Sequence, residues 1–480
     1  MLGRCLETLG YSDERSPAVF PMLPDNRTHA RAREREWWCV QTLVVLAAVL
    51  ACTTTAGAQE PQQPPPTNVH EHVAVTAPLL TPTKEASGTA WLPQITPMYG
   101  VHRPWRGWDL RLAGVVFVQT LYEPGDRHRT GGSSTRQAGS VNWGMVMARR
   151  SAGGGRFGVR AMLSAEPWTV RGCGSLSFLA TGEVCQGDTI HDRQQQHDLF
   201  MELAVDYDRR LRGTWSWQAY GGLAGEPALG PPGYPHRASA ITNPIGPVTH
   251  HWLDSTHVTF GVVTVGVHNQ RWKGEASIFN GREPDESRVD LDLGAFDSVA
   301  ARMSFLPTAR LALQVSAGHL REASSDFPFP NQDPSTRVTA SAIYHMPFGT
   351  TGIWATTLAA GTNHARATVS GGILDATTVA SLLESRITFS DRHTLFARGE
   401  VGGMPAHHLH AHEISTSVVP IGKVQLGYVR HLRAMKGVQP GLGGTAALSF
   451  LPPALAPRYS GRMAPSVGLF FSLQAAGHQM

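Results

Sequence analysis

Apolar and charged residues alternate with a period of two between Asp198 and Asp208. The apolar residues occupy one parity and the acids the other: Leu199, Met201, Leu203, Val205 and Tyr207 against Asp198, Glu202, Asp206 and Asp208. Successive side chains of a β-strand point to opposite faces, so this segment is predicted to be a strand with one apolar and one charged face. Such a strand fits a boundary between an apolar medium and water.

The same alternation recurs from Trp108 to Gln474, in segments separated by clusters of Gly, Pro, Asn and Asp. We count about 14 to 16 such segments and predict an all-β fold, a transmembrane antiparallel β-barrel formed by residues 105–480. Charged residues stay off the apolar parity and are predicted to line the lumen: Arg111, Arg160, Glu202, Asp206, Lys273, Glu275, Arg302, Glu384, Arg386, Arg398 and Glu400.

The alternative fold is a secreted soluble β-sandwich or propeller. A soluble core calls for broader Leu, Ile and Phe clusters on the inward side, whereas one face here often carries Ala, Val, Trp and Tyr, as lipid and its interface allow. The sequence shows no propeller-blade repeat. The segment from Val467 to Leu473 resembles the aromatic C-terminal strand that outer-membrane barrels present to their assembly machinery. The expected partners are therefore outer-membrane lipid and the barrel assembly machinery.

The chain begins with an export signal. Arginines precede an apolar run from Val40 to Ala51, and Ala56-Gly57-Ala58 supplies a cleavage site. We predict residues 1–58 to be a presequence and signal peptide, with Met22 as an alternative start and Cys52 as an alternative, lipid-modified cleavage position. Residues 59–104 are Pro-rich and are predicted to be a disordered periplasmic segment. Export and a barrel together predict the outer membrane of a Gram-negative bacterium.

Composition narrows these expectations. Only 16% of the residues are charged and 50 are Gly, yet the mature chain has no run of the roughly 18 apolar residues that a transmembrane helix needs. The formal net charge is +4, which does not call for a nucleic-acid partner.

After removal of the presequence two cysteines remain, and an even pair in an exported protein predicts a disulfide between Cys173 and Cys185 rather than a metal site.

Two long stretches interrupt the strand rhythm, Glu166 to Asp198 and Gly225 to His257. Long barrel loops either cover the outside or fold into the lumen as a constriction, and the sequence leaves both possibilities open for the second stretch. Its Pro and Gly residues restrict its path, and the side chains that give it something to pack or bind form a loop motif: Glu226, Pro227, His236, Arg237, His250, His251, Trp252, Asp254 and His257.

Four segments resemble a family of uncharacterised proteobacterial outer-membrane β-barrel proteins, often encoded near copper and other heavy-metal resistance genes: Asp192 to Leu203, Gly225 to Pro231, His250 to Thr256 and Phe279 to Asp285. The resemblance covers about residues 85 to 475 and implies location and fold, since the family offers no activity to transfer. Members read His-Pro where this chain has Gln195-Gln196, a departure that weakens the case for a histidine metal site in that loop.

Histidine is the residue type that suggests metal chemistry. If the segment from Ala406 to Glu413 is extended, His408, His410 and His412 share one side, and neutral imidazoles in that arrangement suit copper or zinc. The alternative interpretation is a polar, solvated loop that binds no metal. For His250, His251 and His257 the corresponding alternative is hydrogen bonding to backbone carbonyls within a compact loop.

Motifs of known enzymes are missing from the sequence: it has no G-x-S-x-G, no H-E-x-x-H and no Walker A. We therefore predict no enzymatic activity and no resident cofactor, apart from a speculative copper or zinc site. The favoured function is a passive, porin-like channel for small polar solutes or metal ions. The alternatives are a non-conducting metal-binding or structural barrel, and a membrane-embedded hydrolase using Ser255. The oligomeric state is left open.

Overall fold

A computed structural model describes residues 85–125, 132, 134–321, 334–349, 351–369, 372–411, 418–459 and 461–478. The predicted signal peptide, residues 59–84 and His412 lie outside the described residues. In the part that is described, no helix is long and apolar enough to cross a membrane.

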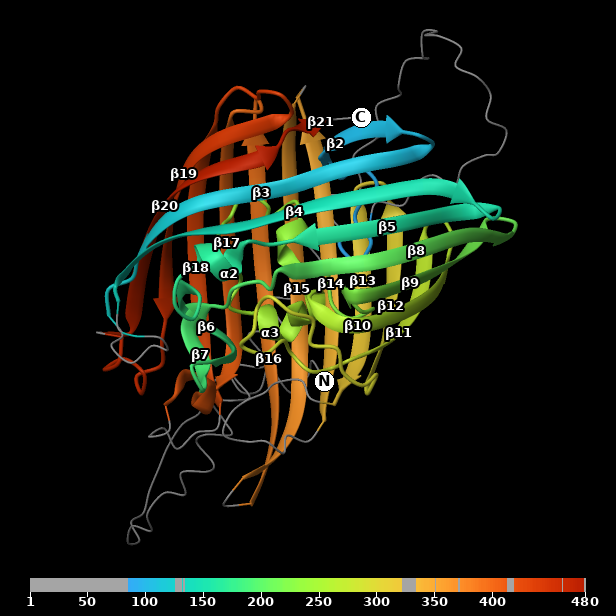
Figure 1. Cartoon of the computed structure of the whole chain (residues 1–480). Helices are drawn as coiled ribbons and strands as arrows, with labels where there is room; N and C mark the ends of the chain where they lie inside the picture. The colour runs from blue at the N-terminus through green and yellow to red at the C-terminus, as the bar shows by residue number, and fades with distance from the viewer. Residues whose placement is uncertain are drawn as a thin grey trace, which may run out of the picture. The chain divides into compact units, whose positions relative to one another are not determined.

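Sixteen antiparallel strands close into a barrel, as predicted (Figure 1). Each strand pairs with the next along the chain, apart from one hairpin that leaves the ring between β5 and β8, and β20 closes on β3. The ring consists of β3 (Trp108–Tyr122), β4 (Arg136–Ala152), β5 (Gly155–Leu163), β8 (Phe200–Arg212), β9 (Trp215–Gly225), β10 (Thr259–His268), β11 (Trp272–Phe279), β12 (Ser298–Thr308), β13 (Leu311–Leu320), β14 (Ser335–Phe348), β15 (Gly352–Val369), β16 (Gly372–Phe389), β17 (His393–Pro405), β18 (Val418–His431), β19 (Val438–Phe450) and β20 (Met463–Ala475).

Short elements complete the described chain. Strand β2 (Val101–Trp105) pairs with the start of β3, and β1 (Met98–Tyr99) pairs with β21 (Gly477–His478). The hairpin outside the ring is formed by β6 (Ser175–Cys185) and β7 (Asp188–Gln194). The helical turns are α2 (Glu166–Thr169), η3 (Tyr234–His236), α3 (His250–Leu253), η4 (Ser255–His257) and η5 (Ala406–Leu409).

The alternation along each strand sets the two faces of the wall. In β12, the outward side chains of Val299 and Met303 are each 52% exposed, whereas Arg302 between them is 2% exposed. The large hydrophobic side chains on the ring strands that remain exposed lie on the outer face, as the period-two pattern requires. The barrel therefore presents apolar side chains outward and polar ones inward.

The two ends of the barrel differ. Short turns such as 153–154 and 309–310 join strands at one end, which we call the turn end, and longer connections such as 164–199 and 226–258 lie at the other, the loop end. Figure 1 shows β2 and β21 together at one end of the wall and the β6–β7 hairpin toward the opposite end. Short periplasmic turns and longer outer loops are typical of outer-membrane barrels.

Three segments pack inside this wall. We call them the inner segment (residues 85–97), the cap hairpin (residues 164–199, with β6 and β7) and the lumen loop (residues 226–258). Most residues of the inner segment and the lumen loop are buried, whereas the cap hairpin is buried only in part, with Trp168 and residues 186–188 exposed. The sequence predicted a linker up to Pro104; instead residues 85–97 pack within the barrel and β2 already belongs to the sheet. The linker expectation was wrong here because the polar groups of the inner segment find partners on the wall.

Candidate functional site: the filled lumen

The charged residues predicted to line the lumen all lie on inward-facing strand positions. Ten of them are buried, and Arg111 is half-buried. Most of these groups do not border open water, because the inserted segments cover them. The alternation of the sequence indicated the face of each residue correctly but not what occupies the space in front of it.

The inner segment contributes a carboxylate to one group of wall charges. Glu85 Oε2 accepts hydrogen bonds from Arg149 Nη2 and Arg160 Nη2, both at 2.8 Å, and its Oε1 accepts from Gln218 Nε2 at 2.6 Å. Arg160 Nη2 also donates to Asp206 Oδ1 at 3.0 Å. A buried arginine placed between two carboxylates needs such partners, because an unpaired charge in this position is costly.

Backbone groups of the inner segment form hydrogen bonds with two further charged side chains of the wall, Glu202 and Lys273. Gly88 N donates to Glu202 Oε1 at 3.0 Å, and the Lys273 ammonium donates to the carbonyl of Thr89. Gly88 adopts a left-handed backbone conformation with φ +56°, and a Cβ there would lie 2.7 Å from the Cβ of Glu226. This position therefore requires glycine.

Arg302 joins the inner segment to the lumen loop. Its Nη2 donates to Thr89 Oγ1 at 3.1 Å, its Nη1 donates to the carbonyl of Gly230 at 3.1 Å, and its Nε donates to Glu275 Oε1 at 2.8 Å. The buried carboxylate of Glu226 accepts from Ser87 Oγ at 2.5 Å and lies 3.6 Å from Arg302 Nη1. Strand β12 thus holds both inserted segments through one guanidinium.

The lumen loop is anchored across the barrel by Arg237. Its Nε donates to Glu384 Oε1 on β16 at 2.6 Å, and its Nη1 donates to Asp254 Oδ2 at 2.6 Å. Glu384 also accepts from Ser239 Oγ at 2.8 Å and from Arg398 Nε at 3.2 Å. Arg237 and Asp254 belong to the predicted loop motif, and the structure brings them together with two of the predicted wall charges.

Further contacts continue along the lumen loop toward β18. Thr249 N and Oγ1 donate to Glu400 Oε1 at 3.0 and 2.9 Å, and Asn243 Nδ2 donates to Gln425 Oε1 at 2.8 Å. Trp252 Nε1 donates to Thr378 Oγ1 at 2.8 Å. The loop therefore folds into the lumen, which answers the question that the sequence left open.

The cap hairpin covers the loop end of the lumen. Cys173 and Cys185 form a disulfide across it. Phe178 is fully buried in an apolar cluster with Trp252 and Leu253 of the lumen loop. Lys423 of β18 donates to Ser177 Oγ at 3.0 Å and to the Phe178 carbonyl at 3.2 Å.

The free space that the described residues enclose lies mainly at the turn end. A cavity of about 410 Å³ there is lined by residues that include Tyr99, Arg386, Arg392, Arg433 and Asp391. A second, of about 40 Å³, shares Tyr99 with it and extends to Arg111.

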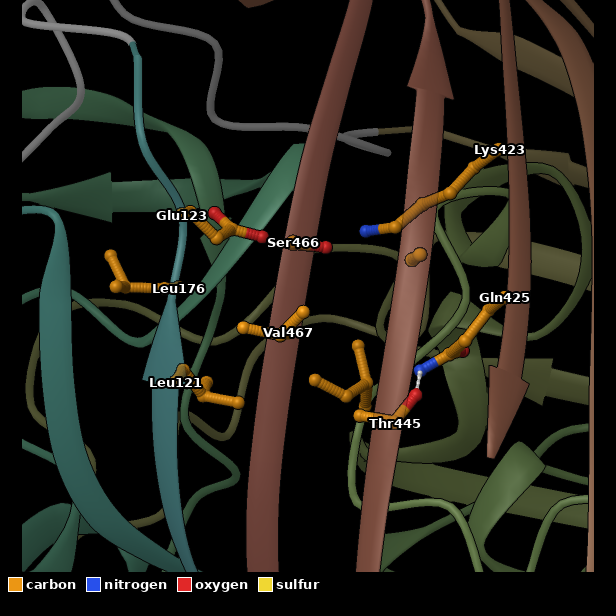
Figure 2. A pocket seen from close by; sticks show the side chains of 10 residues that line it. Leu121, Glu123, Leu176, Lys423, Gln425, Thr445, Ser466 and Val467 are labelled. Carbon is orange, nitrogen blue, oxygen red and sulfur yellow. Dashed lines mark hydrogen bonds between the residues drawn. The ribbon is translucent and has the colours of Figure 1, made fainter. Parts of the chain in front are cut away.

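A small cavity of about 10 Å³ lies deeper, beneath the cap hairpin, between the β3 end and strands β18 to β20 (Figure 2). Figure 2 shows Lys423 and Gln425 on one strand, with Gln425 Nε2 donating to Thr445 Oγ1 at 2.9 Å on its neighbour. The inward positions of β19 and β20 are mostly small, with Gly441, Gly443 and Gly468 among them.

The predicted histidine metal site does not form as expected. Residues Ala406–Leu409 form the turn η5, so His408 and His410 do not share the face of an extended segment. The His410 ring stacks on His191 with centroids 4.1 Å apart, and its Nε2 lies 2.7 Å from Thr189 Oγ1. Within the described residues, one group of three acids or histidines has ligand atoms close enough for a metal, the largely exposed Asp285, Asp290 and Asp292.

Of the remaining loop-motif residues, His250, His251 and His257 line a cavity at the loop end, whereas His236 lines the cavity that extends to Arg111. Pro227, Trp252 and His257 are buried, and His236, His250 and His251 are half-buried. His236 packs on Trp143 of β4 with ring centroids 4.9 Å apart.

The hydrolase alternative also finds no assembled site in the described chain. Ser255 Oγ accepts a hydrogen bond from Arg337 Nη1 at 2.8 Å. His251 Nε2 lies 2.9 Å from the carbonyl oxygen of Thr181, and His257 Nδ1 lies 2.9 Å from that of Asp254. Neither ring is positioned by these contacts to take a proton from Ser255.

No family model matches the sequence, and no curated protein matches it. Solved structures of outer-membrane barrels are similar to it in fold. The outer membrane channel DcaP of Acinetobacter baumannii is 9% identical and has a TM-score of 0.47, with 78% of this chain and 99% of that one covered. The anion-selective porin from Comamonas acidovorans is 10% identical with a TM-score of 0.45, covering 76% and 99%. Salmonella typhi OmpF is 12% identical with a TM-score of 0.45, covering 78% and 100%.

Sequence reasoning missed the inner segment and one histidine contact. Glu85, Gly88 and Trp91 were assigned to a linker, although an acid and a tryptophan soon after a proline-rich stretch are a weak signal of packing. His197 was read only as part of a family motif. Its partners, Glu166 and His257, are distant in sequence and could be found only in the fold.

Proposed function

We propose that the protein is a passive outer-membrane channel for small polar solutes, narrowed by its own inserted segments. The observation that carries the proposal is the closed barrel with an apolar outer face and a polar lumen that opens at the turn end into a cavity of about 410 Å³. A barrel of this size is wide enough to leave an aqueous path when it is not filled.

The outer face supports the membrane location. Side chains such as Val118, Val265 and Leu426 are 54, 56 and 61% exposed on three different strands. In water this continuous apolar wall would be a large liability, whereas lipid solvates it at no cost. Short turns at one end and long connections at the other give the orientation usual in the outer membrane of Gram-negative bacteria.

The mouth at the turn end favours anions. Arg386, Arg392 and Arg433 line the large cavity together with one acid, Asp391. Basic groups without acidic partners, in a mouth whose protein walls have a low dielectric constant, concentrate anions and repel cations. We therefore expect small anions to pass more readily than metal cations, a choice that the sequence alone did not make.

The solute path follows the wall formed by β18, β19, β20 and β3. The inner segment and much of the lumen loop occupy the opposite side, and the lumen loop also reaches the β18–β3 wall through Asn243 and Ile245. Permeation along the wall depends on the cap hairpin, which covers the small cavity at Lys423. We propose a narrow, low-conductance pore rather than a wide diffusion channel, and no resident cofactor or catalytic site takes part.

One observation favours a second candidate, a barrel that does not conduct. The cavities beyond the turn-end mouth, at Arg111 and beneath the cap hairpin, are only about 40 and 10 Å³. A path of that size holds single water molecules and not a continuous hydrated column. The function would then be that of a structural barrel, or of a barrel that binds metal on its loops.

Planar-bilayer recording of the refolded full chain separates the two. The channel proposal expects small, resolved current steps with a reversal potential that favours anions under a salt gradient. Silence of the refolded protein, with its barrel verified by circular dichroism and heat-modifiable migration, would support the non-conducting barrel.

A further inference from the structure

Two histidines from different inserted segments meet at the loop end. His197 lies at the end of the cap hairpin, just before β8, and His257 ends η4 in the lumen loop. Their Nε2 atoms are 3.2 Å apart, and both side chains are largely buried. Both line a cavity of about 40 Å³ together with His250. The sequence distance of 60 residues between them is bridged only by the fold.

The other ring nitrogen of each histidine is already committed as a donor. His197 Nδ1 lies 3.0 Å from Glu166 Oε1, and the same carboxylate accepts from the backbone N–H groups of His197 at 2.9 Å and Asn142 at 3.2 Å. Glu166 accepts in all three contacts, so the Nδ1 of His197 carries the hydrogen in its contact with Oε1. His257 Nδ1 lies 2.9 Å from the carbonyl oxygen of Asp254, which can only accept.

Two neutral rings held in this way bring their Nε2 lone pairs close together. At 3.2 Å that arrangement is repulsive unless a proton, a cation or a hydrogen-bond donor engages the lone pairs. The Tyr234 hydroxyl is 3.3 Å from His197 Nε2, where it can donate a hydrogen bond or act as a third ligand of a bound ion. Because the Nδ1 of His257 donates to the Asp254 carbonyl oxygen, its Nε2 is the atom that can bind a cation.

We propose that His197 and His257 bind a divalent transition-metal ion through their Nε2 atoms. Imidazole nitrogens suit Zn²⁺, Cu²⁺ and Ni²⁺. Two nitrogens 3.2 Å apart, each about 2.0–2.1 Å from a shared ion, subtend about 100–105° at that ion, close to tetrahedral. The Nδ1 contacts to a carboxylate and to a backbone carbonyl are those that orient histidine ligands in metal sites.

Water from the adjoining cavity and the Tyr234 hydroxyl complete the coordination. The ion would join the cap hairpin to the lumen loop, because each contributes one ligand. This site is distinct from His410, whose ring contacts Thr189 and His191. It needs no conduction, so it can fail or hold independently of the channel proposal.

The competing occupant of the gap is a proton. Burial lowers the pKa of His197, but the Glu166 carboxylate outweighs this effect and raises it overall. A protonated His197 would donate from Nε2 to His257 and relieve the same repulsion. The experiment must therefore distinguish a metal from a shared proton.

The test is Zn²⁺ titration calorimetry and Cu²⁺ electron paramagnetic resonance on the refolded full chain without an affinity tag, at pH 7.5. We expect one Zn²⁺ per chain, and Cu²⁺ spectra with coupling to two imidazole nitrogens. His257→Gln and His197→Gln should each abolish tight Zn²⁺ binding and the Cu²⁺ spectrum with coupling to two imidazole nitrogens. Glu166→Gln, which keeps both ligands, should weaken binding about 10- to 100-fold.

His410→Gln serves as the matched control, because it removes an imidazole from the same end of the barrel and should leave the Zn²⁺ affinity unchanged within about twofold. Circular dichroism and heat-modifiable migration verify that each variant is folded. The proposal is overturned if the wild-type chain binds no Zn²⁺, if it binds as tightly after His257→Gln, or if only His410→Gln abolishes binding. If the wild-type chain binds no Zn²⁺ and NMR spectra show a proton shared between the two rings, the gap between His197 and His257 holds a proton.

Discussion

Replacing Glu384 by Gln should release the lumen loop from the barrel wall. The carboxylate is buried and accepts from Arg237 Nε, Ser239 Oγ and Arg398 Nε at 2.6, 2.8 and 3.2 Å. Glutamine has nearly the same shape, but it removes the only negative charge that faces both guanidinium groups and points an amide N–H at one of them. The strand ladder of β16 is untouched, because its hydrogen bonds are made by the backbone.

The size of the effect follows from the burial of the pair. Arg237 and Glu384 side chains are 0 and 1% exposed, so solvent does not screen them. Removing one partner of a buried ion pair costs about 3–5 kcal/mol. Because each 1.4 kcal/mol is a factor of ten, the undocked fraction of the loop should rise by roughly two to more than three orders of magnitude.

Two assays report on loop release. Limited proteolysis should cut Glu384→Gln faster within residues 226–258, and single-channel recording should show larger and more frequent current steps than for the wild type. Asp208→Asn is the matched control: it breaks a buried contact between two wall strands, His268 Nε2 to Asp208 Oδ2 at 2.5 Å, that does not involve the loop. Equal proteolysis and conductance of Glu384→Gln and wild type would refute the anchoring role of Glu384, as would the same change in Asp208→Asn.

Three further predictions concern the inserted segments and the mouth. Gly88→Ala should destabilise the inner segment by at least about 1–2 kcal/mol, because alanine is strained in this left-handed backbone conformation. The effect should be seen as faster hydrogen exchange at residues 85–97. Gly107→Ala is the control: Gly107 also has a positive φ, but no atom lies near its Cβ, so hydrogen exchange at residues 85–97 should not change. Arg433→Glu should shift the reversal potential toward cations, and an unchanged potential would place the selective step elsewhere. Replacing both cysteines by serine should cost the cap hairpin about 3 kcal/mol of loop-closure entropy, measured as proteolysis between residues 174 and 184 with the thermal transition of the barrel unchanged.

The wall of the barrel could be predicted from the sequence because its physics is local. A strand side chain faces inward or outward according to its parity, so Arg302 between Ala301 and Met303 is assigned to the lumen by its neighbours alone. Turns rich in Gly, Pro and Asn separate the strands, and the count of about 14 to 16 segments includes the sixteen of the structure.

The contents of the lumen could not be predicted in the same way. Glu85 lies in a segment without periodicity, and its partner Arg160 is 75 residues away along the chain. Parity shows that Arg160 points inward, yet an arginine facing water and one facing a buried carboxylate have the same local sequence. The extended segment assumed for His408 and His410 does not form, because η5 turns the chain there; the metal site itself stays a prediction, since His412 lies outside the described residues. His197 and His257 are brought together by two folded segments that the local sequence does not reveal.

The central claim, a lumen narrowed by docked segments that still conducts, is tested most directly by single-channel recording of the refolded full chain before and after protease cleavage within residues 226–258. The account predicts small anion-favouring current steps before cleavage and a severalfold larger conductance afterwards, in an intact barrel. Absence of current both before and after cleavage would contradict the claim, and so would a large conductance that cleavage leaves unchanged.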